Sequence, residues 1–267
     1  MKIGIVGSGA VGRSIGAFAA GGAVSGLTLA GICDADSAKA ARVAAELGVP
    51  SMSLAELLGA CDLVVEATAA AAMPGIVREA VASGTRVLTL SVGGFALDAD
   101  LVDFVRERGG EVYLPSGGIV GIDGLLALRE LGLERVEITT IKAPRSLAGA
   151  PYFQRPENSG LLENLAGPRL VFSGSAREAI AAFPANVNLA VTVSLAGIGV
   201  DRTRISIHAD PAATVTRQRL LAVGGGCRLE TEVAGPPLPE NPRTSLLAAN
   251  SVKALLRSLA SAVRVGT

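Results

Sequence analysis

The sequence of 267 residues lacks an excess of charge and lacks long hydrophobic runs. Its 24 Lys and Arg residues balance its 24 Asp and Glu residues, and charges of one sign form no block. A balanced chain has no strong electrostatic attraction for nucleic acid or for an anionic membrane. No window of about 18 apolar residues is uninterrupted, as a membrane-spanning helix would require. We therefore expect neither nucleic acid nor a membrane as a partner.

Residues that carry catalytic or metal chemistry are scarce. There is no Trp, there is one His (His208), and the three Cys residues are far apart without the spacing of metal ligands. The sequence thus predicts no metal site, and free thiols in a reducing cytoplasm. The N-terminus lacks the apolar core of a signal peptide, because a glycine turn interrupts the first apolar run. A single histidine limits the options for acid–base catalysis.

That glycine turn is the most informative stretch. The apolar segment Ile3–Val6, typical of a strand, runs directly into Gly7-Ser-Gly-Ala-Val-Gly12. In a dinucleotide-binding fold the first glycine permits the tight turn, the second lets a pyrophosphate approach, and the third allows close helix–strand packing. Free N–H groups at the helix start favour phosphate. A purely structural turn is the alternative in a chain with 33 glycines. We predict cofactor contacts from Gly7, Ser8, Gly9, Ala10, Val11 and Gly12.

An acidic residue follows at the distance that such a site requires. The apolar segment 27–34 ends in Asp34, which is 22 residues after Gly12. An Asp at this place accepts hydrogen bonds from the adenosine ribose and repels the 2′-phosphate of NADP. The sequence therefore favours NAD as the cofactor, with NADP as the alternative.

Segments typical of strands and helices alternate as far as residue 115. This alternation indicates βαβ units and a parallel sheet, so residues 1–115 are predicted to form a Rossmann NAD(P)-binding domain of the α/β class. Ligands of such sheets bind at the carboxyl ends of the strands. This rule adds Ala67, Thr68 and Ser91 to the predicted cofactor contacts.

Residues 116–267 have a different pattern, which predicts an α+β domain that supplies substrate-binding groups. Alternating segments at 136–142, 203–209, 214–223 and 227–233 predict mostly antiparallel strands, and helices are expected at 175–183 and 186–195. Two stretches rich in proline, 144–168 and 235–242, are predicted loops. The last helix, at about 244–262, is a candidate to pack back on the first domain.

Three residues of this domain are candidates for substrate chemistry. Lys142 ends a predicted strand and could hold a carboxylate, while Arg145 offers the bidentate geometry that lysine lacks. His208 lies on the polar face of a predicted strand, where a catalytic role competes with an ordinary surface role. Solvated charges are the alternative for the two cations.

Amide and hydroxyl groups form a second set of candidates. Asn186 and Asn188 begin an apolar helix, so one of them could cap it while the other binds a nicotinamide carboxamide or a substrate. Asn241 and Thr244 precede the last helix and could cap it or contact the substrate.

The whole chain resembles the L-aspartate dehydrogenase family. The motifs that carry the resemblance occur in the family's order: Gly7-Ser-Gly-Ala-Val-Gly12, Pro115-Ser-Gly-Gly-Ile119, Thr139-Thr-Ile-Lys-Ala-Pro144, Phe183-Pro-Ala-Asn-Val-Asn188, Ala209-Asp-Pro211 and Glu240-Asn-Pro-Arg-Thr-Ser245. The resemblance implies NAD(P)-dependent oxidative deamination of aspartate through iminosuccinate to oxaloacetate and ammonia, or the reverse reductive amination, which can feed NAD biosynthesis. It also implies a homodimer built through the second domain, and it puts Gly118 and Asn188 at the nicotinamide end.

One position departs from the family pattern. Counting back from Glu240 without a gap, the family's catalytic histidine corresponds here to Gln218. Glutamine can orient water but cannot titrate, and loss of one acid–base group typically costs about 10²- to 10⁴-fold in rate. Three outcomes stay open. The chain is a slower aspartate dehydrogenase with His208 or Lys142 as the proton carrier, a dehydrogenase or imine reductase for another amino or imino acid, or a non-catalytic NAD-binding regulator.

Other two-domain oxidoreductases share this organisation. Dihydrodipicolinate reductase and homoserine dehydrogenase also join a Rossmann domain to an α+β domain. Their histidine- or lysine-rich substrate motifs are not found in this sequence.

Overall fold

The computed structural model describes residues 1–184, 188–238 and 241–266, and it divides the chain into two compact units. The first unit consists of Met1–Pro115 together with Ala249–Val265, so the C-terminal helix belongs with the N-terminal part of the chain. The second unit contains Ser116–Ala248. In the described part of the chain, no helix is both long enough and apolar enough to cross a membrane.

The first unit is built on a five-stranded parallel sheet in the order β2-β1-β3-β4-β5. Its strands are β1 (Lys2–Val6), β2 (Thr28–Cys33), β3 (Leu63–Glu66), β4 (Arg86–Thr89) and β5 (Val112–Tyr113). From β1 the chain moves outward to β2 and then returns to place β3 on the other side of β1. The crevice between the carboxyl ends of β1 and β3 is therefore the topological switch point, where such sheets bind ligands.

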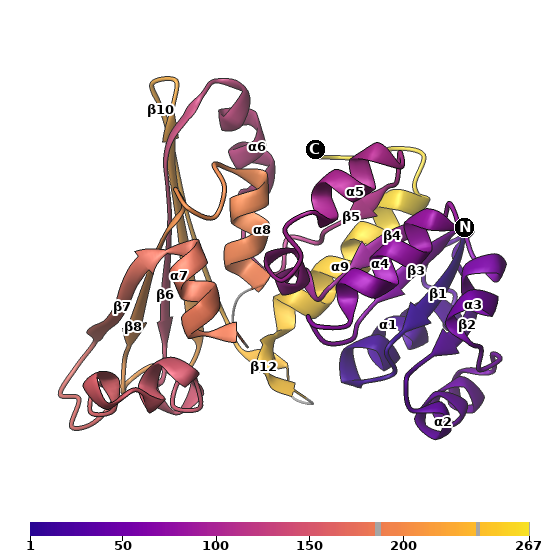
Figure 1. The fold of residues 1–267 in the computed structure, drawn as a ribbon, viewed down its shortest axis with the longest axis horizontal. Helices are drawn as coiled ribbons and strands as arrows, with labels where there is room; N and C mark the ends of the chain where they lie inside the picture. Colours follow the sequence, from indigo (N-terminus) through magenta and orange to yellow (C-terminus); the bar gives the residue numbers. More distant parts are fainter. Residues whose placement is uncertain (185–187, 239–240, 267) are drawn as a thin grey trace. The chain divides into compact units, whose positions relative to one another are not determined.

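Helices cover both faces of this sheet (Figure 1). One face packs against α1 (Ala10–Ala20), α2 (Ser37–Leu47) and α9 (Leu246–Ala260), and the other against α3 (Leu54–Ala60), α4 (Met73–Ala82) and α5 (Leu101–Glu107). Side chains that alternate along the strands explain this division. Ile3 and Ile5 face the first group, whereas Val6 faces the second.

The second unit contains a mixed sheet in the order β10-β9-β6-β8-β7. Its strands are β6 (Leu133–Lys142), β7 (Arg169–Ser175), β8 (Arg204–Ala209), β9 (Thr216–Gly224) and β10 (Cys227–Gly235). Only β6 and β8 pair in parallel; the other neighbours are antiparallel. A short antiparallel pair, β11 (Pro237–Leu238) and β12 (Asn241–Ser245), precedes α9.

The helices of the second unit lie on one side of its sheet (Figure 1). They are α6 (Ile122–Glu130), α7 (Ala176–Ala182) and α8 (Asn188–Ala196). The segment between β6 and β7 forms three short 3₁₀ turns, at Pro144–Ser146, Pro151–Gln154 and Pro156–Asn158. Rings of Tyr152 and Phe153 pack with Phe172 and Phe183, at centroid distances from 5.1 to 5.8 Å, and anchor these turns to the core.

The predicted fold class is confirmed: an α/β domain with a parallel sheet is joined to an α+β domain. Two local predictions were wrong. Strand β7 follows a predicted loop without having been predicted itself, and β11 with β12 occupies the predicted loop at 235–242. The last helix consequently begins at Leu246 rather than near Thr244.

Candidate active site

The glycine turn leaves an open space at the start of α1. Gly7 has a φ of +99°, which L side chains rarely adopt, and a Cβ there would lie 2.5 Å from the carbonyl oxygen of Ala67. A Cβ on Gly12 would lie 1.9 Å from the carbonyl oxygen of Gly7. A Cβ on Gly9, in contrast, would meet no atom within 4 Å. A phosphate group can therefore approach the backbone at Gly9.

The N-terminus of α1 suits an anion in its electrostatics as well. No side chain caps the helix at Gly9, and its first turn contains no acidic residue. The free N–H groups and the positive end of the helix dipole favour a phosphate there. Ala10 and Val11 form that first turn. The residues present thus fit the pyrophosphate of a dinucleotide.

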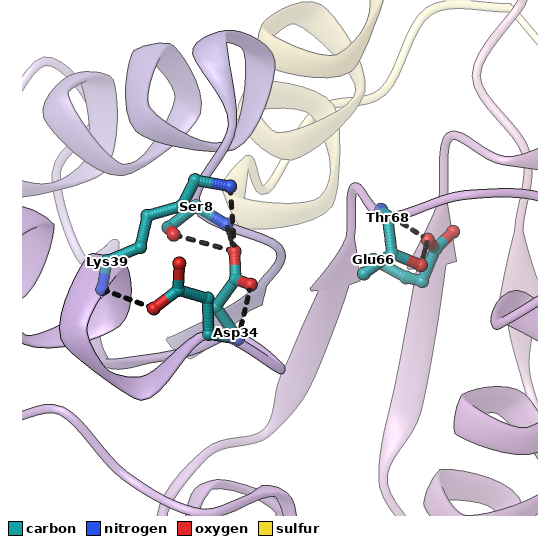
Figure 2. Close-up of polar contacts among 6 residues, drawn as sticks. Ser8, Asp34, Lys39, Glu66 and Thr68 are labelled. Carbon is teal, nitrogen blue, oxygen red and sulfur yellow. Dashed lines mark hydrogen bonds and ion pairs between the residues drawn. The ribbon is translucent and has the colours of Figure 1, made fainter.

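Asp34 lies at the end of β2 beside the same turn (Figure 2). Its Oδ2 accepts hydrogen bonds from the backbone N–H and the hydroxyl of Ser8, both at 2.7 Å, and lies 3.2 Å from Nζ of Lys39. Burial by itself raises the pKa of Asp34, but the bonds from Ser8 and Lys39 hold that pKa well below its usual range. Asp34 is therefore a charged hydrogen-bond acceptor beside the glycine turn.

The ends of β3 and β4 are joined by a buried carboxylate. Glu66 is fully buried, and it accepts hydrogen bonds from the backbone N–H and hydroxyl of Thr68, from the hydroxyl of Thr89, and from the N–H and hydroxyl of Ser91. These bonds fix two of the predicted cofactor residues, Thr68 and Ser91. Ala67 lies between them and the glycine turn, where it contacts Gly7.

The second unit contains a small cavity that is partly open to solvent. Most of its wall is apolar, with Ile138, Phe183 and Ile207 among the lining residues. The polar groups of the described lining are Thr140, Lys142 and Gln218.

Sheet register explains why these three polar residues share the cavity. Thr140 on β6 is directly opposite Gln218 on β9, so their side chains point to the same face. Lys142 is two residues beyond Thr140 and returns to that face. Burial in this apolar environment lowers the pKa of Lys142 to about 8. Lys142 therefore loses its proton at a lower pH than an exposed lysine does.

His208 does not share this cavity. It pairs with Ile141 of β6, so its side chain points to the opposite face of the sheet from Thr140 and Gln218. The sequence left both His208 and Lys142 open as substitutes for the missing histidine. The structure brings Lys142 to Gln218 and separates His208 from it.

The remaining predicted residues fall into three groups. Gly118 is buried with a φ of +89°, and Arg145 and Asn188 are exposed. Arg145 lies on the 3₁₀ turn that follows Lys142 and is not among the described residues that line the cavity. Asn241 and Thr244 lie on β12, where the structure describes the backbone alone. Asn186 lies outside the described residues.

Two residues of the candidate site were not predicted from the sequence. They are Glu66, which binds the loops after β3 and β4, and Thr140, which lines the cavity. Glu66 is the last residue of an otherwise apolar strand, which is an unusual place for a charge and could have drawn attention. Thr140 alternates with neighbours of similar polarity, so only the register of the sheet reveals its face.

Together, the parallel sheet, the open glycine turn and the acidic residue after β2 define a dinucleotide-binding protein with a separate cavity-bearing domain. Residues 7–115 match the NAD-binding domain of homoserine dehydrogenase, and residues 123–259 match the C-terminal domain of aspartate dehydrogenase. The first domain is accordingly a nicotinamide dinucleotide-binding domain.

Relatives match over the full length. The chain is 41% identical to an L-aspartate dehydrogenase of Methanosarcina acetivorans and 38% identical to one of Methanosarcina mazei. Each comparison covers 100% of this chain and 100% of the relative. The solved structure of aspartate dehydrogenase from Thermotoga maritima has a TM-score of 0.76 at 23% identity, over 100% of this chain and 99% of that chain, and is similar in fold. This chain belongs to the L-aspartate dehydrogenase family.

Proposed function

We propose that the protein is an NAD(P)-dependent dehydrogenase that oxidises L-aspartate to iminosuccinate, which is hydrolysed to oxaloacetate and ammonia, or that catalyses the reverse reductive amination. The observation that carries this proposal is the end-to-end identity of 41% with an L-aspartate dehydrogenase. The open glycine turn of the first unit and the lysine-bearing cavity of the second supply the two sites that the reaction needs.

NAD is the proposed cofactor. The Asp34 carboxylate would accept ribose hydroxyls and repel a 2′-phosphate. Lys39, however, lies 3.2 Å from that carboxylate and weakens the repulsion. Titration of the protein with each dinucleotide tests this point: NAD should bind more tightly, and Lys39→Ala should widen the difference. Equal affinities for NAD and NADP would refute this role of Asp34.

Lys142 is the proposed acid–base group. Among the described residues that line the cavity, it is the one with an ionisable side chain. When bound, the dinucleotide supplies the hydride acceptor for C2 of the substrate. As water bonds to C2 of the protonated imine, neutral Lys142 accepts one proton from it, which leaves a hydroxyl and an amine on C2. Lys142 then returns this proton to the amine nitrogen. As the C2–N bond breaks, the hydroxyl loses its proton to the departing ammonia and becomes the ketone of oxaloacetate, so ammonium and oxaloacetate leave.

Substrate carboxylates need hydrogen-bond donors of their own, because Lys142 acts here as the acid–base group. Arg145, Asn241 and Thr244 are the proposed partners, because an arginine fork matches a carboxylate and the other two lie on the strand before α9. Gly118, Asn186 and Asn188 are proposed at the nicotinamide end. Gln218, which is opposite Thr140, is proposed to orient the attacking water.

Turnover in the direction of amination tests the activity. Purified protein with NADH, oxaloacetate and ammonia should oxidise NADH, followed by absorbance. No turnover from about pH 6 to about pH 10 would eliminate aspartate dehydrogenase activity. Omitting ammonia controls for reduction of oxaloacetate itself.

The glutamine at position 218 favours a second candidate, a dehydrogenase or imine reductase for a different amino or imino acid. A panel of amino acids with NAD separates the candidates, and NAD binding without any turnover would indicate a regulatory protein instead. Gln218→His should raise aspartate turnover several-fold if the position accepts a base. An unchanged rate would show that it does not.

A homodimer is part of the proposal. Among the described residues of the second unit, no helix covers the sheet face opposite to α6, α7 and α8. Thr139, Ile141 and Leu221 point to this face, which we call the open sheet face, and each is half-buried. A second copy of the chain would cover it.

The cytoplasm is the proposed cellular setting. The cysteines Cys33, Cys61 and Cys227 are free thiols, which suits the cytoplasm. In the oxidative direction the product of hydride transfer is iminosuccinate, a building block for NAD biosynthesis.

A further inference from the structure

Glu66 is a buried charge that the proposed reaction does not use. It is the last residue of β3, and its side chain is inaccessible to solvent. In the described part of the chain its contacts come from hydroxyl and backbone N–H groups rather than from a cation. Burial of a carboxylate is costly in free energy unless hydrogen-bond donors replace the water that it loses.

Each carboxylate oxygen of Glu66 accepts from a backbone N–H group, which cannot rotate away as a hydroxyl can. The backbone N–H of Thr68 lies 2.6 Å from Oε1, and the backbone N–H of Ser91 lies 3.2 Å from Oε2. The hydroxyls of Thr68 and Thr89 lie 2.6 and 2.5 Å from Oε1 and Oε2. The carboxylate form, which accepts at both oxygens, satisfies these donors, and it is the form on which the proposal below is built. An amide would place its NH₂ group against one of the two N–H groups.

These bonds tie together two loops at one edge of the sheet. Thr68 follows β3 and Ser91 follows β4, and the single proton of the Ser91 hydroxyl is shared between Glu66, at 3.0 Å, and the carbonyl oxygen of Thr68, at 2.9 Å. Figure 2 shows Glu66 and Thr68 at the end of β3, apart from Asp34 at the end of β2. The glycine turn after β1 lies between these two strands in the sheet order.

This order determines which half of a dinucleotide lies over Glu66. With the pyrophosphate on the turn after β1 and the adenosine ribose at Asp34 beyond β2, the nicotinamide half must extend over β3 and β4. The nicotinamide ring carries a positive charge in NAD⁺ and none in NADH. A fixed negative charge below this half favours the oxidised form.

We propose that Glu66 is a positioning residue of the nicotinamide half of the site, whose carboxylate fixes the loops after β3 and β4 and whose charge favours NAD⁺ over NADH. The inference rests on the proposed dinucleotide site. It adds a residue that sets the relative affinity for the two redox states of the cofactor.

Binding of both cofactor forms to Glu66→Gln tests the charge. Calorimetric titration should show weaker NAD⁺ binding, and the ratio of the NAD⁺ and NADH dissociation constants should rise by about fivefold or more, the lower range of coupling between groups that do not touch. Thr89→Val is the matched control. It removes one donor and keeps the charge, so it should leave the ratio unchanged.

Several results would overturn the proposal. An unchanged ratio in Glu66→Gln, or an equal change in Thr89→Val, would show that the charge does not select the oxidised form. Wild-type protein that binds neither dinucleotide would instead refute the proposed function. Should Glu66→Gln fail to fold, Glu66→Asp keeps the charge and should retain the wild-type ratio with weaker binding of both forms; a shifted ratio would contradict the charge effect.

Hydrogen exchange in the wild-type protein tests the positioning role without a variant. The amides of Thr68 and Ser91 both donate to Glu66, so both should exchange slowly although they lie beyond the ends of their strands. Fast exchange of either amide in the absence of cofactor would contradict a fixed loop.

Discussion

The negative charge of Asp34 stabilises the first unit. Hydrogen bonds from Ser8 and Lys39 outweigh its burial and lower its pKa in the folded state. A lowered carboxyl pKa stabilises the fold above the unfolded value of about 4, and this contribution is lost as the pH falls through the folded value. Asp34→Asn should lower the free energy of unfolding by about 1.5–3 kcal/mol at neutral pH.

Denaturant unfolding as a function of pH checks this prediction. The difference between Asp34→Asn and wild type should shrink below about pH 4. Glu46→Gln is the control, because the Glu46–Arg13 pair is exposed and should contribute less than about 1 kcal/mol. A difference that stays constant into acid would refute the role of the charge.

The lowered pKa of Lys142 predicts how the activity depends on pH. Its pKa is lowered to about 8, because the cavity is mostly apolar, and only the neutral amine accepts a proton. For the oxidation of aspartate, kcat/KM should rise with pH in two parts, one near pH 8 from Lys142 and one from the amine of free aspartate, since this parameter reports free enzyme and free substrate. Lys142→Met should remove the part near pH 8 and most of the activity. Lys253→Met, on α9, should keep the profile; a profile unchanged in Lys142→Met would exclude Lys142 as the base.

Which residues could be predicted from the sequence depends on how local their contacts are. Gly7 and Asp34 belong to a motif of fixed spacing, so their positions followed from the sequence. The position of Glu66 at the end of an apolar strand was a signal, but its partners were not predictable, because Thr89 and Ser91 are 23 and 25 residues away. For His208, the alternation of its strand predicted two faces, but only pairing with β6 tells which face holds the cavity.

At the scale of elements, β7 illustrates why one strand was missed. Pairing with β8 shifts register between Leu170 and Phe172, which leaves Val171 as an extra residue. Val171 and Phe172 are consequently both buried, and the period of two that marks a strand is broken. Strands without such a bulge, among them β8, follow the alternation and were predicted.

Helix α9 completes the core of the first unit although it lies at the other end of the sequence. Its Val252 and Leu256 are buried in the same cluster as Ile5 and Ile15. Leu256→Ala should therefore lower the free energy of unfolding of this unit by about 2–5 kcal/mol. Leu255→Ala, on a half-buried position, should cost less. Thermal unfolding of both variants measures the difference, and equal losses would contradict the packing of α9.

At the scale of the whole molecule, alternating strands and helices predicted the class of the fold, because each βαβ unit is short and periodic. The cavity depends on contacts between distant strands. Gln218 and Thr140 are far apart in sequence and become neighbours only when β9 pairs with β6. Both strands were predicted from the sequence, but their order in the sheet was not.

The open sheet face predicts how two copies of the chain associate. Ile141 and Leu221 are half-buried on it, among charged side chains that include the ion pairs Arg219–Glu232, Arg228–Glu230 and Arg135–Glu137. In a dimer through this face the two apolar side chains would be covered, and a charge introduced at Leu221 would lose its water without gaining a partner. Leu221→Glu should therefore convert the dimer to a monomer of 26.8 kDa.

Sedimentation velocity at several protein concentrations measures this change. Leu131→Glu is the matched control, because Leu131 is 59% exposed and lies beyond the end of α6, away from the open sheet face. Wild type and this control should both sediment as dimers. A monomeric wild-type protein, or a dimer that survives Leu221→Glu, would rule out association through this face. Binding of NAD by the monomeric variant should persist, because the glycine turn and Asp34 both belong to the first unit.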